Sequence, residues 1–174
     1  MLQLVIANTV RILFLILIQA MVVGKIHLFD GLILPYVYIF GLLMLPFQTP
    51  AWLVLIISFF TGWLMDYFTG PVGLHTSSCV FLGFVIPLVN KFLSPREGYD
   101  TSQRPTVQRM GITWYVTYAA ICTFLHHTFL FFLEVFRLSD FFYQIAHIIL
   151  SSIATVMVMV IMQYIIYNTK TTEQ

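Results

Sequence analysis

Six long apolar runs, separated by short polar breaks, decide what this chain can fold into. A helix needs about 20 mostly apolar residues to cross the hydrocarbon core of a bilayer. We therefore predict an all-α integral membrane protein with a single transmembrane domain over residues 1–174. Its six helices are predicted at residues 12–29, 32–47, 51–68, 74–93, 112–133 and 141–167. The second run is the shortest, which indicates tilt, a kink or partial burial against its neighbours.

The composition supports lipid as the solvent of this chain. Hydrophobic residues make up 60% of the sequence and charged residues 9%, whereas a soluble domain carries about 25% charged residues. The net charge of +1 excludes the strongly basic surface that is typical of nucleic-acid binding. Cys79 and Cys122 both lie inside apolar runs, so we interpret them as small buried hydrophobes and not as a disulfide pair.

The positions of Lys and Arg near the helix ends predict the orientation, because cytoplasmic loops of membrane proteins are enriched in these residues. The loop over residues 94–108 is the only long polar one, and we predict that it is cytoplasmic together with both termini. Arg11 is interpreted as the cytoplasmic flank of the first helix. In this topology the cytoplasmic side carries Arg11, Lys91, Arg96, Arg104, Arg109 and Lys170, and the opposite side carries only Lys25 and Arg137.

The same topology predicts that all five histidines lie in the outer half of the protein. Two interpretations remain open. Titratable groups are tolerated at a membrane interface at modest cost, or an outer polar cluster binds a ligand. A metal site is disfavoured, because adjacent histidines on a helix point about 100° apart. The residues of the possible outer cluster are His126, His127, Glu134 and His147, and the other histidines are His27 and His75.

The stretch "GWLMDYFTGPVGLH" (residues 62–75) interrupts the apolar sequence between the third and fourth runs. Ser58, Gly62 and Asp66 are spaced by four, so they form one stripe on the third predicted helix. Small residues at this spacing allow another helix to approach closely in lipid. The stripe therefore predicts a helix-packing surface.

A compact chain reversal follows this stripe and contains Gly70, Pro71 and Gly73. Glycine adopts a positive φ without strain, and proline fixes its own φ. We expect the reversal to bring His75 back to Asp66, with a carboxylate–histidine hydrogen bond across the hairpin. Two interpretations stay open here as well: a helix-hairpin clamp with no ligand, or a contact with a ligand or partner.

Gly62, Asp66, Pro71, Gly73 and His75 also carry a resemblance to the MreD family, the membrane subunits of the bacterial rod-shape system. Three further stretches resemble the form of this family found in Bacteroidota-type bacteria: "KIHLFDGLILPYVYIFGLLMLPFQTP", "SPREGYD" and "HHTFLFFLEVF". The resemblance covers nearly the whole chain. One departure is the sequence Gln48-Thr49-Pro50, where many members have an arginine before the proline.

The resemblance implies a non-enzymatic scaffold in the bacterial cytoplasmic membrane, with no cofactor. Such a subunit binds MreC through a membrane helix and juxtamembrane segment. It helps to couple MreB filaments to the peptidoglycan polymerase RodA and its transpeptidase partner. The resemblance also implies a fold similar to that of the six-helix substrate-binding components of vitamin transporters.

The residues themselves leave two classes of function open. One is a scaffold, and the alternative is a small-molecule-binding transporter component with an outward-facing pocket. An enzyme is not expected, because we find no paired carboxylates at a common depth, no nucleophile with a base and no metal-ligand spacing.

Overall fold

The computed structural model describes residues 2–26, 29, 31–70, 72–99, 104–135 and 141–168, without the side chains of residues 2–5, 135, 167 and 168. Its regular elements are all helical. Five of them are long and apolar enough to cross a membrane: α1 (Leu2–Met21), α3 (Ala51–Thr69), α4 (Leu74–Phe92), α6 (Ile112–Val135) and α7 (Phe141–Asn168). Four are short: the 3-10 helices η1 (Val23–Lys25) and η2 (Val37–Ile39), and the α-helices α2 (Phe40–Leu43) and α5 (Val107–Met110).

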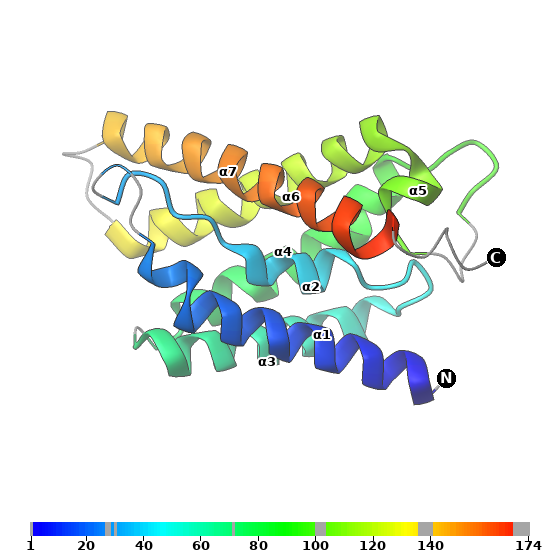
Figure 1. Cartoon of the computed structure of the whole chain (residues 1–174), viewed down its shortest axis with the longest axis horizontal. Coiled ribbons are helices and arrows are strands. Elements are labelled where there is room, and N and C mark those ends of the chain that lie inside the picture. The colour runs from blue at the N-terminus through cyan, green and yellow to red at the C-terminus, as the bar shows by residue number, and fades with distance from the viewer. Residues whose placement is uncertain are drawn as a thin grey trace.

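The long helices run lengthwise through the molecule (Figure 1). Helices α1 and α3 run in the same direction, because the residues between them return to the end where α1 starts, and α3, α4, α6 and α7 then alternate in direction. The start of α1 and the end of α7 lie at one end, beside α5 and the loop after α4; we call this the terminal end. The α3–α4 turn lies at the opposite end, which we call the clamp end. In the packing, α3 contacts α1 and α4, and α6 contacts α4 and α7.

Four of the six predicted helices are confirmed to within two residues: 51–68, 74–93, 112–133 and 141–167 correspond to α3, α4, α6 and α7. The breaks between them contain proline and glycine, which interrupt a helical backbone, or charged residues, which are costly in the hydrocarbon core.

The predicted boundaries of the first helix, 12–29, are wrong. Helix α1 begins at Leu2 and ends at Met21, so Arg11 lies inside it and is not its flank. The guanidinium of Arg11 donates hydrogen bonds to the carbonyl oxygens of Met44 (3.0 Å) and Gly41 (3.4 Å). The last carbonyls of a helix have no partner within that helix, and Arg11 supplies one for α2.

The prediction of a spanning helix over residues 32–47 is also wrong. Residues 31–36 are irregular, and only η2 and α2 follow before a turn. Pro35 explains the difference, because it has no N–H and disfavours helical geometry at Leu34. Pro46 follows, and the ten residues between the two prolines would span only about 15 Å as a helix, roughly half of a bilayer core. We call residues 31–45 the broken segment.

The broken segment is the centre of the molecule and not an edge (Figure 1). Residues 37–45 are all buried, and η2 contacts both α1 and α7. Gly41 allows the closest approach, since a Cβ there would lie 2.8 Å from the Ile12 side chain. An irregular backbone is tolerated at membrane depth only where protein surrounds it, and the long helices provide that surrounding.

Polar side chains from two helices satisfy the irregular backbone. Gln19 of α1 donates to the Pro35 carbonyl (3.1 Å) and accepts from the Val37 N–H (2.6 Å). On α7, the Ser151 hydroxyl accepts from the Leu34 N–H and the Thr155 hydroxyl from the Tyr36 N–H, both at 3.0 Å. These bonds replace the helical ones that Pro35 prevents, which explains why the segment can be buried in an apolar protein.

Candidate functional site

The Asp66 carboxylate joins the end of α3 to the start of α4. It is buried and accepts hydrogen bonds from the backbone N–H groups of His75 (2.8 Å), Gly73 (2.9 Å) and Thr76 (3.0 Å). The Thr76 hydroxyl donates a fourth hydrogen bond to it. The first N–H groups of a helix lack intrahelical partners and carry partial positive charge. Asp66 therefore clamps the two helices together by capping α4.

The proximity of Asp66 and His75 that the sequence predicted is present, but the predicted hydrogen bond between their side chains is wrong. The carboxylate binds the His75 backbone, and the imidazole bonds elsewhere. Gly70 and Gly73 form the reversal with φ values of +98° and +92°, which only glycine adopts easily. Pro71 lies outside the described residues.

The small-residue stripe packs against α4 of the same chain. A Cβ on Gly62 would lie 2.4 Å from the His75 carbonyl oxygen and 2.5 Å from the Thr76 Cα. One turn before Gly62 on α3, the Ser58 hydroxyl would lie 2.5 Å from a Cβ on Gly83 of α4. The predicted close helix approach is confirmed, and α4 covers the surface that a partner helix would have used.

A buried cluster of polar side chains lies beneath the clamp. The Tyr38 hydroxyl of the broken segment lies 3.2 Å from His75 Nδ1 and 3.1 Å from His126 Nε2. The Cys79 thiol donates to the same hydroxyl at 3.5 Å. One phenol therefore links α4, α6 and the broken segment.

Donor counting fixes how protons are shared in this cluster. The Tyr38 hydroxyl has one proton, so one of its two histidine nitrogens must carry a proton and the other must not. His126 Nδ1 has no hydrogen-bond partner among the described residues. Because an orphaned buried N–H is costly, we infer that His126 is protonated at Nε2. His75 then accepts from Tyr38 at Nδ1 and carries its own proton at Nε2.

His127 lies beside this cluster and supports the broken segment indirectly. Its Nδ1 lies 2.9 Å from the Thr123 carbonyl and its Nε2 lies 3.2 Å from the Thr155 hydroxyl. Thr155 in turn binds the Tyr36 backbone. The ring centroid of Tyr36 is 5.3 Å from that of His127 and 5.7 Å from that of His75.

The four residues of the predicted outer polar cluster do not lie together in the structure. His126 and His127 are fully buried, whereas Glu134 is exposed at the end of α6. The Phe131 ring separates His127 from His147, with centroid distances of 5.6 Å and 4.0 Å. The four residues therefore do not form one site; His27 lies outside the described residues.

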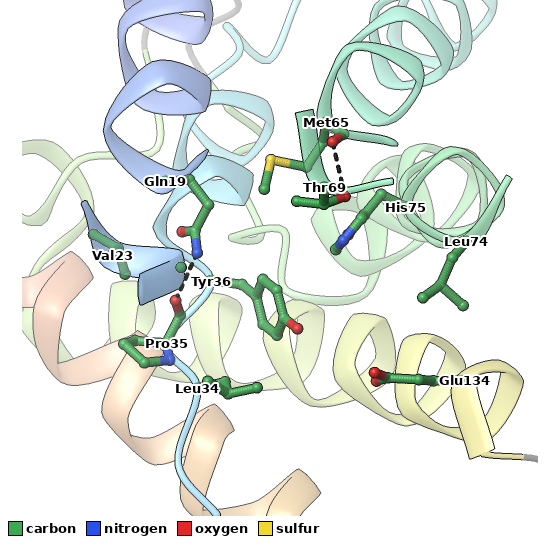
Figure 2. Close-up of a pocket in the computed structure, with 11 residues that line it drawn as sticks. Gln19, Val23, Leu34, Pro35, Tyr36, Met65, Thr69, Leu74, His75 and Glu134 are labelled. Carbon is green, nitrogen blue, oxygen red and sulfur yellow. Dashed lines mark hydrogen bonds between the residues drawn. The ribbon is translucent and has the colours of Figure 1, made fainter. Parts of the chain in front are cut away.

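A polar cavity of about 210 Å³ opens at the clamp end, between α1, the broken segment, α3, α4 and α6 (Figure 2). Tyr36 lies at its centre, with His75 on one side and Glu134 on another. Leu74 and Glu134 also line a wider hollow of about 410 Å³ beside it. The cavity lining consists of Gln19, Val23, Gly24, Leu34, Pro35, Tyr36, Met65, Thr69, Leu74, His75 and Glu134.

The described residues contain no group of three or more His, Cys, Asp or Glu side chains that could hold a metal ion. The chemistry that the cavity offers is binding: a carboxylate at its margin, a phenol at its centre and an imidazole at its wall.

Sequence reasoning missed Gln19, Tyr36 and Tyr38 as site residues, because residues 32–47 were predicted to form a short spanning helix. Two signals were present. Pro35 directly precedes Tyr36, and Ser151 and Thr155 are spaced by four on a mostly apolar helix, a spacing that places both hydroxyls on one face.

Comparison of the chain with protein-family models, with curated proteins and with solved structures finds no match.

Proposed function

We propose that this chain is a non-enzymatic scaffold subunit of the rod-shape system in the bacterial cytoplasmic membrane, like the MreD family that its sequence resembles. The supporting observation is that the motif residues act as one unit. Asp66 caps α4 through Gly73 and His75, and Gly62 lets α4 approach α3. A motif whose described members, Gly62, Asp66, Gly73 and His75, all serve one junction is a more specific signature than its short length indicates.

The distribution of carboxylates favours a scaffold over an ion-coupled transporter, which keeps an acidic group near the membrane midplane. In the described helices, Asp66 lies in the last turn of α3 and Glu134 at the end of α6. The proposed partner is MreC, with MreB, RodA and the transpeptidase coupled indirectly. Since α4 covers the stripe, the membrane helix of MreC would contact an outward-facing surface.

Affinity purification in mild detergent tests this proposal. The tagged chain should recover a bitopic protein with a coiled-coil periplasmic domain, and depletion of the chain should round a rod-shaped host. A tagged multi-pass protein of similar size, expressed at the same level, controls for nonspecific recovery. Normal cell shape after depletion, with no such partner recovered, would reject the scaffold role.

The cavity favours a second candidate, a small-molecule-binding component. Filling it distinguishes the two functions. Thr69 lines the cavity and its hydroxyl donates to the carbonyl one turn earlier; Thr117 makes the same bond on α6 away from the cavity. For a scaffold, Thr69→Phe and Thr117→Phe should both preserve partner recovery and rod shape. For a binder, Thr69→Phe alone should abolish function.

A further inference from the structure

We propose that the cavity at the clamp end binds an ammonium group, with Glu134 as its counter-ion and the Tyr36 hydroxyl as a hydrogen-bond partner. This inference rests on the second candidate function, small-molecule binding, and is independent of the scaffold role. The ammonium group could belong to a small soluble amine or to a lipid headgroup, since both present the same chemistry.

The charge of the lining indicates a cation. Glu134 is the one carboxylate among the described lining residues, and none of them is Lys or Arg. Its side chain is exposed, and it makes no ion pair or hydrogen bond with another described residue. A carboxylate at the edge of such a cavity attracts an ammonium group and forms charge-assisted hydrogen bonds with it.

The hydrogen-bonding capacity of the lining points to the same place. The amide of Gln19 is used by Pro35 and Val37, and the Thr69 hydroxyl is used by its own helix. The Tyr36 hydroxyl makes no hydrogen bond with a described residue, and it points toward the side of the cavity where Glu134 lies (Figure 2). A ligand there would meet the phenol and the carboxylate together.

The size of the cavity sets the size of the group. A volume of about 210 Å³ holds roughly seven waters at about 30 Å³ each, which is enough room for ethanolamine or choline. The adjoining hollow is bordered by Val72, Leu74 and Leu133. These apolar side chains would accommodate the lipid part of a headgroup ligand.

The test uses the purified full chain in two arms. In detergent without added lipid, calorimetric titration measures binding of choline and of ethanolamine. In nanodiscs, native mass spectrometry compares retention of phosphatidylethanolamine with that of phosphatidylglycerol. Each arm is repeated with Glu134→Gln and with the matched control Glu97→Gln, which removes an exposed carboxylate from the loop after α4.

Glu134→Gln should weaken amine binding by about tenfold or more, the effect of losing one charged hydrogen bond, and Glu97→Gln should leave it unchanged. Tyr36→Phe should weaken it less, while keeping the backbone bond to Thr155. Thermal unfolding of each variant verifies that it is folded. Dependence on Glu134 in the titration arm assigns a soluble amine, and dependence in the nanodisc arm assigns a lipid headgroup.

The proposal is overturned if neither arm shows binding, or if Glu134→Gln and Glu97→Gln bind equally. Glycerol and benzoate serve as neutral and anionic probes of similar size. They show whether only the amine proposal fails or whether the cavity binds no small molecule at all. If one of them binds and Thr69→Phe blocks it, the cavity is a binding site for another chemistry.

Discussion

At the scale of single residues, two side chains concentrate the polar contacts of this protein. The Asp66 carboxylate serves three backbone N–H groups and a hydroxyl, and the Tyr38 hydroxyl serves two imidazoles and a thiol. Both groups are buried. A buried polar group without a partner costs about 1–3 kcal/mol of folding free energy. Loss of either side chain would leave several buried groups without a partner at the same time.

We expect the His75 side chain to couple energetically to Tyr38 and not to Asp66. A double-mutant cycle of His75→Gln with Tyr38→Phe should give a coupling energy of about 1 kcal/mol, because the two groups share a hydrogen bond. The cycle of His75→Gln with Asp66→Asn should be additive to within about 0.5 kcal/mol. Unfolding in mixed micelles measures both cycles. A larger coupling to Asp66 than to Tyr38 would contradict the observed bond pattern.

At the scale of elements, the broken segment shows where hydrophobic run length stops being informative. Residues 32–47 are as apolar as the true helices, and only their shorter length and the prolines at positions 35 and 46 distinguish them. The side chains that make the irregular backbone tolerable, Gln19 and Thr155, lie far away in sequence. Long-range partners of this kind cannot be read from a local pattern, whereas the four confirmed helices depended only on local length and local breaks.

Removing these side chains should destabilise the protein, although no backbone hydrogen bond within a helix is lost. Gln19→Leu leaves the Pro35 carbonyl and the Val37 N–H without their partner, with an expected cost of about 2–5 kcal/mol from two lost buried bonds. Thr117→Val is the control, because Thr117 is exposed and bonds only within its helix; it should change stability by less than about 0.5 kcal/mol. Equal unfolding midpoints for the two variants would show that water or lipid replaces Gln19.

The α3–α4 interface makes a second prediction at this scale. Gly62→Leu should destabilise the chain by more than Leu64→Ala, because even a Cβ at position 62 would overlap the backbone of α4. Overpacking of this kind costs about 1–3 kcal/mol or more, and backbone cannot move aside as a side chain can. The measurement is the yield and thermal stability of the monodisperse protein in detergent. A Gly62→Leu variant as stable as the parent would show that α3 and α4 can separate.

At the scale of the whole molecule, the candidate site could be predicted only in part. The glycine-rich reversal correctly placed Asp66 beside His75, since local geometry determines that approach. The direction of the His75 imidazole could not be predicted, because its partner Tyr38 lies on the segment misread as a helix. The cavity has the same origin. Leu34, Pro35 and Tyr36 of the broken segment line it, so it could not be predicted together with a regular helix for this segment.

The arrangement of the two ends yields the last prediction. The loop after α4 lies at the terminal end and the α3–α4 turn at the clamp end (Figure 1). The distribution of Lys and Arg predicts that the first is cytoplasmic and the second is not. Glu97 and Val72 are exposed positions on these two connections. The native residues Cys79 and Cys122 are buried, so they should contribute little background to thiol labelling.

With an impermeant maleimide, Val72→Cys should therefore label in intact cells with an opened outer envelope. Glu97→Cys should label only after the cytoplasmic membrane is permeabilised. Both substitutions replace exposed loop residues, so neither should disturb packing. If the two positions label together in intact cells, α4, the helix between them, does not span the membrane. If the pattern is reversed, the clamp end and its cavity face the cytoplasm, and an amine bound beside Glu134 would come from that side.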